Sequence, residues 1–365
     1  MITRVLHVLN KISVDSGVST VVMNYYSKLD HNRITFDFML NEEPSPSIRA
    51  YIESNGSKIF VMPGLKFVNT IKYIKALKQF YLTNDYKIIH GHVANSAVFY
   101  LGLAKNTPFK IIHSHNSKAS DIFWKSVRNR ILSLRIKSTA NLFFACSNDA
   151  ANFLFGSNTN AVIVNNSIDI GSFIFSQMKR DKKRAELGLS DEPLIGHIGR
   201  FCPQKNPGFI IDVFHEIYKK NKNFRLMLIG SGELYPQIQQ KVKKSGLEDA
   251  VFFPRITEDI SGYLSAMDVF VLPSLFEGIP LTAVEAQASG LPVLLSDKIS
   301  KDVDVTGETV FLPLDKSLWV NSILSVTAND RIAAGKRVKN SRFDIDTQVE
   351  ELCGYYEGLL RSGIL

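Results

Sequence analysis

Two carboxylates, Glu277 and Glu285, stand on either side of an expected helix start, and their spacing could support chemistry. Ile279-Pro280 predicts that start, since proline is favoured in the first helical turn, where its missing N–H costs nothing. The apolar run within 268–272 predicts a buried strand that leads into this loop. In open α/β sheets, a helix N-terminus at the carboxyl end of a parallel strand binds phosphate. A carboxylate there suits hydroxyl groups, so we expect a ligand that carries both phosphate and hydroxyls.

Basic residues occur at a second expected strand-to-helix turn. Gly199-Arg200 closes a strand, and Lys205-Asn206-Pro207 opens the next helix. Arginine offers a planar fork to phosphate oxygens and lysine a mobile point charge, and each charge-assisted hydrogen bond is worth roughly 1.5–3 kcal/mol. A solvated basic turn is the alternative for so short a motif. The turn Gly230-Ser231-Gly232 follows another strand and would let the backbone approach a nucleotide closely.

Polar residues also mark strand ends in the first half of the chain. His90, His92, His113 and His115 lie at two such ends, which favours a role in substrate contact. A metal site is the alternative, but no carboxylate or cysteine spacing supports it, so we favour substrate contact and expect no metal. The polar loop around Gly17 predicts either a site for phosphate or acceptor or an ordinary helix N-cap.

A basic, aromatic segment spans residues 122–137, with Lys125, Arg128 and Arg130 among its cations and Phe123 and Trp124 at its start. Its pattern is typical of a helix that lies on anionic lipid, where each basic residue contributes about 1 kcal/mol. An ordinary packed helix with a basic outer face is the alternative interpretation.

Alternating strand and helix patterns predict two α/β domains in the 365-residue chain. A polar, lysine-rich stretch at 172–193 separates two series of strands. We therefore expect a first Rossmann-like domain over 1–172, completed by a C-terminal helix at about 345–365, and a second over 173–344. Expected strands are 3–9, 34–40, 58–62, 87–91, 110–114, 142–146 and 161–165, then 194–199, 224–230, 250–253, 268–272, 292–295 and 309–312.

Charge and cysteine content place further limits on the function. Residues 1–172 carry 19 Lys+Arg against 10 Asp+Glu, whereas the remainder carries 24 against 25. A basic half predicts an anionic surface or substrate, and nucleic acid is disfavoured because no reader motif accompanies it. Three dispersed cysteines favour a reducing cytoplasm.

Together these residues resemble glycosyltransferase family 4, the retaining GT-B enzymes, over nearly the whole chain. The Glu-x7-Glu signature from Glu277 to Glu285 carries the resemblance most strongly, and Gly199-Arg200 with Lys205-Asn206 is similar to the family's phosphate-binding segment. His113-Ser114-His115-Asn116 and the helix around Met23-Asn24-Tyr25-Tyr26 look most like the branch that builds bacterial capsular polysaccharide and exopolysaccharide.

The resemblance implies a role for each matching residue. Arg200 and Lys205 would hold the donor diphosphate, with the N–H groups of Gly278, Ile279 and Leu281 adding to its binding. Glu285 would accept hydrogen bonds from the ribose, Glu277 would face the donor sugar, and His115 would lie across a cleft between the domains, near the sugar's primary hydroxyl. The C-terminal helix would cross back onto the first domain. Where the family has paired glycines this chain reads Ser16-Gly17, and where it has asparagine-glycine it reads Asn166-Ser167.

The resemblance thus implies a cytoplasmic transferase that moves a sugar, without a metal or other cofactor, from a nucleotide-sugar, expected to be a UDP-sugar, to a saccharide or lipid-linked acceptor. Peripheral contact with the inner face of the plasma membrane through 122–137 is a further expectation. Retention fits same-face attack, or a covalent step that needs two carboxyl groups roughly 5 Å apart. A sugar-nucleotide epimerase, a glycan phosphorylase and a non-catalytic nucleotide-sugar or membrane-binding module are the alternatives.

Overall fold

The structure is a computed structural model that describes residues 2–13, 16–115, 135–157, 159–254, 259–327, 330–339 and 341–362, without the side chain of Phe67. The chain divides into two compact units, here called unit 1 (Met1–Ser167 with Ile345–Leu365) and unit 2 (Ile168–Asp344). The division therefore falls five residues before the expected one at 172/173. The cause is that the chain enters unit 2 at Ile168, whose N–H bonds to the Phe343 carbonyl there.

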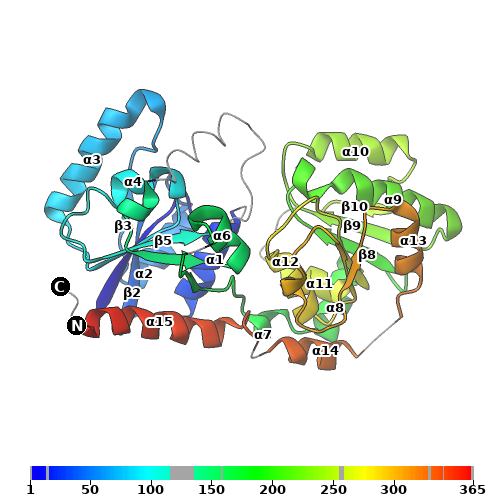
Figure 1. The fold of residues 1–365 in the computed structure, drawn as a ribbon. Coiled ribbons are helices and arrows are strands. Elements are labelled where there is room, and N and C mark those ends of the chain that lie inside the picture. Colours follow the sequence, from blue (N-terminus) through cyan, green and yellow to red (C-terminus); the bar gives the residue numbers. More distant parts are fainter. Residues whose placement is uncertain are drawn as a thin grey trace. The chain divides into compact units, whose positions relative to one another are not determined.

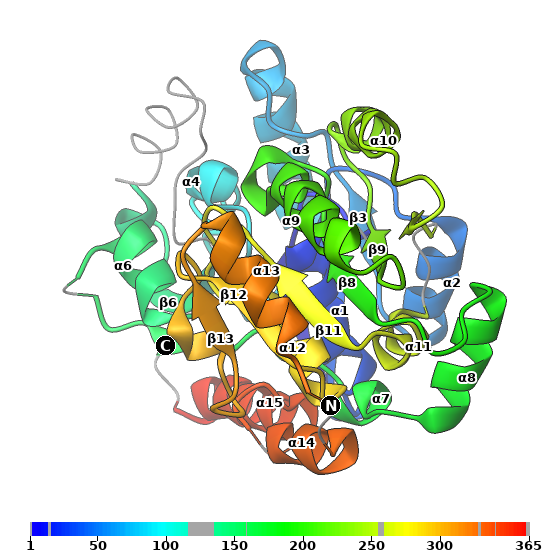
Figure 2. The same ribbon diagram turned by 90° about the vertical axis from the view of Figure 1, so that its right-hand side faces the viewer.

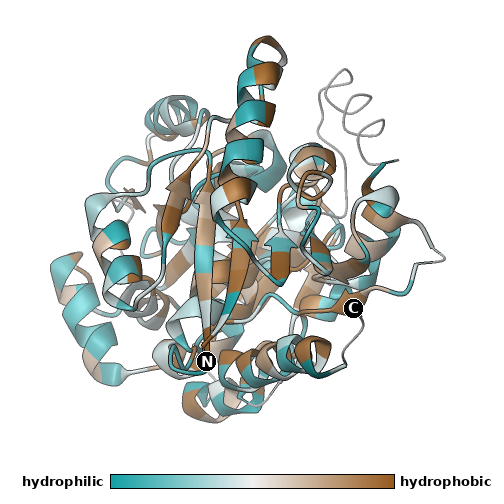
Figure 3. Cartoon of the chain, turned by 90° about the vertical axis from the view of Figure 1, so that its left-hand side faces the viewer, coloured by the Kyte–Doolittle hydropathy of each residue, from teal (hydrophilic) through white to brown (hydrophobic). Residues whose placement is uncertain are grey.

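Unit 1 is built on a seven-stranded parallel sheet with the order β3-β2-β1-β4-β5-β6-β7 (Figure 1). Its strands are β1 (Thr3–Val8), β2 (Ile34–Leu40), β3 (Ile59–Val61), β4 (Ile88–Gly91), β5 (Phe109–Ser114), β6 (Leu142–Ala145) and β7 (Val162–Ile163). Helices cover both faces of a parallel sheet, so its central strands are largely buried, and β2 and β4 are buried along their whole length. In Figure 3 the hydrophobic colour prevails on the strands, whereas the helices carry much more of the hydrophilic colour.

Helices cover both faces of this sheet. They are α1 (Gly17–Ser27), α2 (Pro46–Ser54), α3 (Thr70–Thr83), α4 (Ala97–Tyr100), α6 (Asn148–Phe155) and α15 (Ile345–Arg361). The core on one face joins the strands to α3, α4 and α6. On the other face α15 packs beside α1, and its Tyr356 is fully buried against Phe36 of β2. The C-terminal helix thus returns to the first sheet, as expected.

Unit 2 contains a six-stranded parallel sheet with the order β10-β9-β8-β11-β12-β13 (Figure 2). Its strands are β8 (Leu194–Ile198), β9 (Arg225–Ile229), β10 (Val251–Phe252), β11 (Val269–Leu272), β12 (Val293–Ser296) and β13 (Val310–Leu312). Every strand expected from the sequence is thus present in one of the two sheets, and the fold class is confirmed as two parallel α/β layers.

The helices of unit 2 lie on both faces of its sheet. They are α7 (Ile170–Phe173), α8 (Gln177–Glu186), α9 (Pro207–Lys220), α10 (Tyr235–Lys244), α11 (Ile260–Ala266), α12 (Leu281–Ala288), α13 (Lys316–Leu324) and α14 (Arg331–Val338). One core joins the sheet to α9, α10 and α13, and the other joins it to α11 and α12. The basic cluster at 179–184 lies inside α8, so it is helical and not a free linker. No helix of the described residues is long and apolar enough to cross a membrane.

Candidate functional site

The residues expected to bind the donor lie in unit 2, where the strand order reverses. β9 flanks β8 on one side and β11 flanks it on the other. The loops after β8 and β11 therefore leave the same edge of the sheet as neighbours, which is where open α/β sheets bind ligands. Arg200 and Lys205 follow β8, and Glu277 follows β11.

Lys205 and Glu277 form an ion pair at this edge. Lys205 Nζ lies 2.6 Å from Glu277 Oε1, and the two side chains are only 13% and 11% exposed. The backbone holds the two segments together: the Leu275 N–H donates to the Gln204 carbonyl over 2.8 Å, and Gln204 Nε2 donates to the Phe276 carbonyl over 3.0 Å. The sequence placed both charged residues at the site, and the structure brings them into direct contact.

The ion pair leaves Glu277 with hydrogen-bonding capacity to spare. Its Oε1 is close to Lys205 Nζ, yet it has no hydrogen bond of good geometry with any residue in the described part of the chain. We therefore interpret the contact as a pairing of charges and not as a directed hydrogen bond. Since an ionised carboxylate accepts several hydrogen bonds, Glu277 can accept one from a ligand hydroxyl while Lys205 balances its charge.

Arg200 is exposed, and its side chain forms no hydrogen bond or ion pair with the residues that the structure describes. The structure thus places it on the expected loop without bringing it onto the ion pair. Its guanidinium remains able to form a bidentate contact with an anion such as phosphate.

The glycine turn after β9 packs directly on the loop that carries Arg200. Gly232 has φ +148°, and a Cβ at this position would lie 2.4 Å from the Phe201 carbonyl oxygen. The Phe201 N–H donates to the Ser231 carbonyl over 2.7 Å, and the Leu234 N–H donates to the Phe201 carbonyl over 2.9 Å. The turn therefore sets the position of the loop after β8, a role that the sequence did not indicate.

Helix α12 begins one residue later than expected. Pro280 is its N-cap residue and Leu281 its first helical residue, whereas the sequence predicted proline inside the first turn. The extended backbone of Pro280, with ψ 118°, explains the difference. At the other end Gly290 adopts φ +64°, the left-handed conformation that commonly follows a helix, so the expected end is confirmed.

Glu285 lies on α12 and is 9% exposed. Burial, which disfavours the ionised form, raises the pKa of Glu285 to about 7. A carboxyl group with this pKa changes between its neutral and ionised forms near neutral pH. The N–H groups expected to bind the ligand are those of Gly278, Ile279 and Leu281, which precede Glu285 on the loop and in the first turn of α12. N–H groups in the first turn of a helix have no acceptor within the helix, so they are free to bind a ligand.

His197 is a buried titratable residue at this edge that the sequence reasoning missed. It is the penultimate residue of β8, and its Nδ1 donates to the Val271 carbonyl over 3.0 Å. Burial, with a smaller contribution from the charge of Lys205, lowers the pKa of His197 to about 4. The imidazole is therefore neutral and supports the loop without adding positive charge. Its place inside an apolar strand run gave no signal in the sequence.

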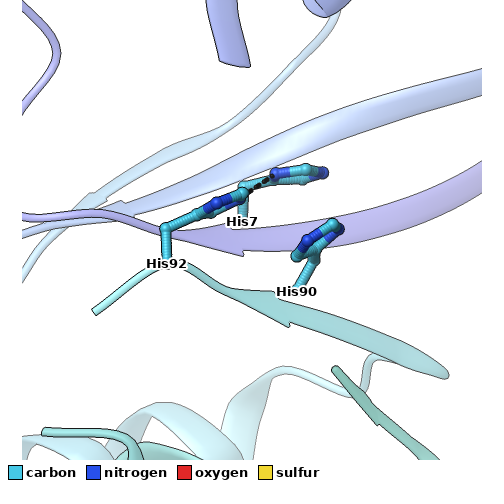
Figure 4. Close-up of side chains that lie close together, drawn as sticks. All are labelled: His7, His90 and His92. Atoms are coloured by element: carbon cyan, nitrogen blue, oxygen red, sulfur yellow. Dashed lines mark hydrogen bonds between the residues drawn. The ribbon is translucent and has the colours of Figure 1, made fainter. Parts of the chain in front are cut away.

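Unit 1 gathers five histidines at its own point of strand-order reversal, between β1 and β4. The set, here called the histidine cluster, comprises His7, His90, His92, His113 and His115. His7 Nδ1 lies 3.0 Å from His92 Nε2, and His92 Nδ1 lies 2.8 Å from His115 Nε2. Figure 4 shows the start of this chain of rings at the ends of β1 and β4. The sequence predicted the two strand-end pairs but not His7, which joins them because β1 pairs with β4.

The cluster is neutral near pH 7. Burial lowers the pKa of His7 to about 3 and that of His115 to about 4, and it lowers the pKa of the other three well below the usual value. Nε2 of His115 pairs with His92, whereas Nδ1 is buried and has no hydrogen bond of good geometry with the described residues. His115 can therefore act on a ligand only as a neutral hydrogen-bonding group.

The cluster contains two trios whose ring nitrogens lie within 4.8 Å of one another: His7, His90 and His92, and His92, His113 and His115. Two nitrogens bound to one zinc ion would lie about 3.3 Å apart, given Zn–N bonds of about 2.05 Å and tetrahedral angles. The nitrogens that pair here are 3.0 and 2.8 Å apart, which fits hydrogen bonds between neutral rings. No described carboxylate or cysteine joins either trio.

The loop that carries Gly17 caps helix α1. Ser16 is the N-cap residue, and its side chain accepts the Ser19 N–H over 3.4 Å. A Cβ at Gly17 would meet nothing within 4 Å, so space does not require glycine there. The expected acceptor-side role of Gly17 stays a prediction. The basic segment at 122–137 falls largely outside the described residues, because 116–134 are not described.

Comparison with known proteins identifies the kind of protein to which this site belongs. A family model described as glycosyl transferases group 1 matches residues 192–329, the part that contains the ion pair. EpsF of Bacillus subtilis (strain 168), whose name places it among the glycosyltransferases, is 32% identical over 342 residues, covering 90% of this chain and 88% of EpsF.

One further relative and one solved structure of similar fold were found. The Escherichia coli enzyme named UDP-Gal:alpha-D-GlcNAc-diphosphoundecaprenol alpha-1,3-galactosyltransferase is 27% identical over 297 residues, covering 77% of this chain and 76% of the enzyme. The crystal structure of Anabaena HepE in complex with UDP-glucose superposes with a TM-score of 0.80 at 18% identity, covering 97% of this chain and 99% of HepE. The latter likeness concerns the fold.

Proposed function

This chain belongs to the group 1 glycosyltransferases and is a transferase of the GT-B type, and from that premise we propose that it moves a sugar, with retention of configuration, from a UDP-sugar to a lipid-linked glycan acceptor. The observation that carries the proposal is the contact between Lys205 and Glu277 at the reversal point of unit 2. A lysine that balances a carboxylate beside a helix N-terminus suits a ligand with both phosphates and hydroxyls.

In the proposed reaction the phosphate charge is met by protein cations. Lys205 and the exposed Arg200 bind the diphosphate, and the N-terminal N–H groups of α12 add their partial positive charge. As the bond to the anomeric carbon breaks, negative charge builds on the departing diphosphate, and preorganised donors stabilise it. These cations supply the positive charge that a metal would otherwise provide, so the proposal includes no metal and no other cofactor.

The two carboxylates have separate tasks in this proposal. Glu277, partly exposed beside Lys205, accepts a hydrogen bond from a hydroxyl of the donor sugar near the reacting carbon. Glu285, one helical turn and more into α12, accepts hydrogen bonds from the ribose in its ionised form. His115, neutral and in unit 1, contributes a hydrogen bond to the donor sugar when the ligand is bound.

The acceptor is proposed from the name of the Escherichia coli relative and from the charge of this chain. That relative's name specifies a sugar on diphosphoundecaprenol, a lipid carrier. Residues 1–172 of this chain have nine more basic than acidic residues, which suits an acceptor that carries a diphosphate. We therefore place the acceptor on unit 1, with Gly17 in its loop, and the reaction at the cytoplasmic face of the membrane in capsule or exopolysaccharide synthesis, with 122–137 as one contact to anionic lipid.

The decisive experiment measures sugar transfer by purified protein from a panel of UDP- and GDP-sugars, with separate variants of the ion pair. Lys205→Ala and Glu277→Ala should each reduce transfer about 100-fold or more, since removing one preorganised electrostatic contact typically has that effect. The matched controls are Lys219→Ala and Glu216→Ala, which break an exposed ion pair in α9 of the same unit.

Product analysis separates the proposal from its rivals. Transfer of a labelled sugar to a glycan supports it, whereas an isomerised donor or phosphate-dependent cleavage would identify an epimerase or a phosphorylase. Nucleotide binding without any product would identify a binding module. Full turnover in both ion-pair variants would refute the assignment of the site.

A further inference from the structure

The outer face of α3, together with Val68 just before it, carries exposed apolar and basic side chains that no part of the proposed reaction uses. We propose that this face, defined by Val68, Ile71, Lys75, Lys78 and Leu82 and here called the α3 stripe, docks on an anionic phospholipid bilayer. The stripe is distinct from the segment at 122–137.

The spacing of the helical residues places them on one line. Residues 71, 75, 78 and 82 follow the i, i+4, i+7, i+11 pattern, which returns to the same side of a helix with 3.6 residues per turn. Ile71 and Leu82 stand at the two ends, about 16 Å apart along the axis at 1.5 Å per residue, and the lysines lie between them. In Figure 3, where α3 is the upright helix at the top, hydrophobic and hydrophilic residues alternate on its surface.

The opposite side of α3 is already occupied. Tyr73, Leu77 and Phe80 are buried in the core that joins the helix to the sheet of unit 1. The orientation of the helix is therefore fixed by its packing, and the α3 stripe cannot turn inward to bury its apolar residues within unit 1.

The exposure of the apolar residues is high. Val68 is 90% exposed, Leu82 80% and Ile71 74%. The outward face of a surface helix is normally polar, and scattered apolar residues there need no explanation. Three large apolar side chains arranged around a row of lysines are a different pattern, which is typical of helices that lie in the interface of a bilayer.

The charge of this region selects the partner. From residue 54 to residue 84 the chain contains five lysines and no aspartate or glutamate. Lys72, Lys75 and Lys78 are exposed on α3 and form no ion pair within the described part of the chain. A symmetric contact with a second copy would bring these lysines against one another. An anionic bilayer instead offers negative head groups to the lysines and acyl chains to Ile71 and Leu82.

Docking would leave the long lysine stems along the membrane surface with their ammonium groups among the head groups, while the apolar side chains enter the boundary below. Each lysine near such a surface strengthens binding about fivefold. The attraction is screened by salt, because the charges are exposed to solvent. Binding should therefore weaken between 0.05 M and 0.5 M NaCl.

The purpose of this surface rests on the proposed lipid-linked acceptor, which lies in a membrane, but the binding is tested without any reaction. The full chain is mixed with sedimentable vesicles of phosphatidylglycerol and phosphatidylethanolamine, or of phosphatidylcholine, and the bound fraction is measured. We expect binding to the anionic vesicles. Lys72→Gln/Lys75→Gln/Lys78→Gln should weaken it about 100-fold, and Ile71→Ser/Leu82→Ser at least tenfold.

Matched controls isolate the surface from total charge. Lys220→Gln/Lys243→Gln/Lys244→Gln removes three exposed lysines from α9 and α10 of unit 2 and should leave vesicle binding unchanged. All variants should keep the wild-type Tm and the wild-type transfer to a water-soluble acceptor analogue, since the residues are exposed. If the wild type shows no such transfer, the proposed reaction is refuted, while the vesicle-binding result still stands.

Two outcomes would overturn the proposal. One is vesicle binding that is equal for the wild type and both α3 variants. The other is a dimer that forms with rising protein concentration in sedimentation velocity and that is absent in the Ile71→Ser/Leu82→Ser variant, although this variant still binds vesicles. This result would show that the α3 stripe binds a second copy of the chain.

Discussion

The raised pKa of Glu285 predicts that unit 2 loses stability as the pH rises from about 4.5 to about 7. An ordinary glutamate has a pKa of 4.5, and burial raises that of Glu285 to about 7 in the folded protein. Below pH 4.5 the carboxyl group is protonated in both states and has no differential effect. Between pH 4.5 and 7 only the unfolded state releases the proton, so the free energy of unfolding falls with rising pH. Above pH 7 the loss is complete.

The magnitude follows from the two pKa values. Each pKa unit corresponds to 1.36 kcal/mol, so ionised Glu285 should cost about 3 kcal/mol relative to a neutral residue. The side chain is 9% exposed, so solvent screening reduces this figure little. Glu285→Gln keeps the size and polarity of the side chain but cannot ionise. The difference in unfolding free energy between this variant and the wild type should therefore change by about 3 kcal/mol from pH 4 to pH 8, in favour of glutamine.

Urea unfolding at a series of pH values would measure this difference through Trp319, which is buried in unit 2. A Trp124→Phe background makes Trp319 the sole tryptophan, since the chain contains two. Glu248→Gln, an exposed glutamate of the same unit, is the control and should follow the wild type at every pH. If the free energy of unfolding changes with pH in the same way for the wild type and Glu285→Gln, the predicted effect of Glu285 is refuted. If ionised Glu285 binds the ribose, UDP affinity should also fall up to about tenfold per pH unit below pH 7.

Three further predictions concern the loops, the histidines and metal. Gly232→Ala should lower the Tm of unit 2 by several degrees and weaken UDP binding, because the new Cβ would approach the Phe201 carbonyl. The control is Gly246→Ala, where φ is also positive, at +63°, but the space around the glycine is open. This variant should lower the free energy of unfolding in urea by only about 1 kcal/mol and leave UDP binding unchanged. In NMR spectra of protein labelled at histidine, His7 and His115 should stay neutral from pH 8 to pH 5, because burial holds their pKa values at about 3 and 4; titration of either near pH 6.5 would contradict their burial. Prolonged dialysis against EDTA should change neither transfer nor Tm, and activity restored only by added metal would show that Lys205 and Arg200 do not suffice.

The sequence revealed the strands because both sheets are parallel and buried on both faces, so each strand appears as a short apolar run. The position of Glu277 could be inferred from its loop. Its contact with Lys205, 72 residues earlier in the chain, could not, because it depends on β11 pairing with β8. His197 was missed for the opposite reason: it lies inside such a run, where a histidine resembles any other core residue. The N-cap position of Pro280 depends on one backbone angle, which residue preferences do not determine.

The hydrogen bonds that link His7, His92 and His115 have a consequence for the positions of three protons. A neutral imidazole has one N–H and one lone pair, so His92 can donate to only one neighbour and must accept from the other. The three rings therefore carry their protons either all on Nε2 or all on Nδ1. A change at His7, on β1, thereby alters which nitrogen of His115 is a donor, although β4 lies between the two strands. A residue at position 7 that can only accept, or only donate, would fix the tautomer two strands away.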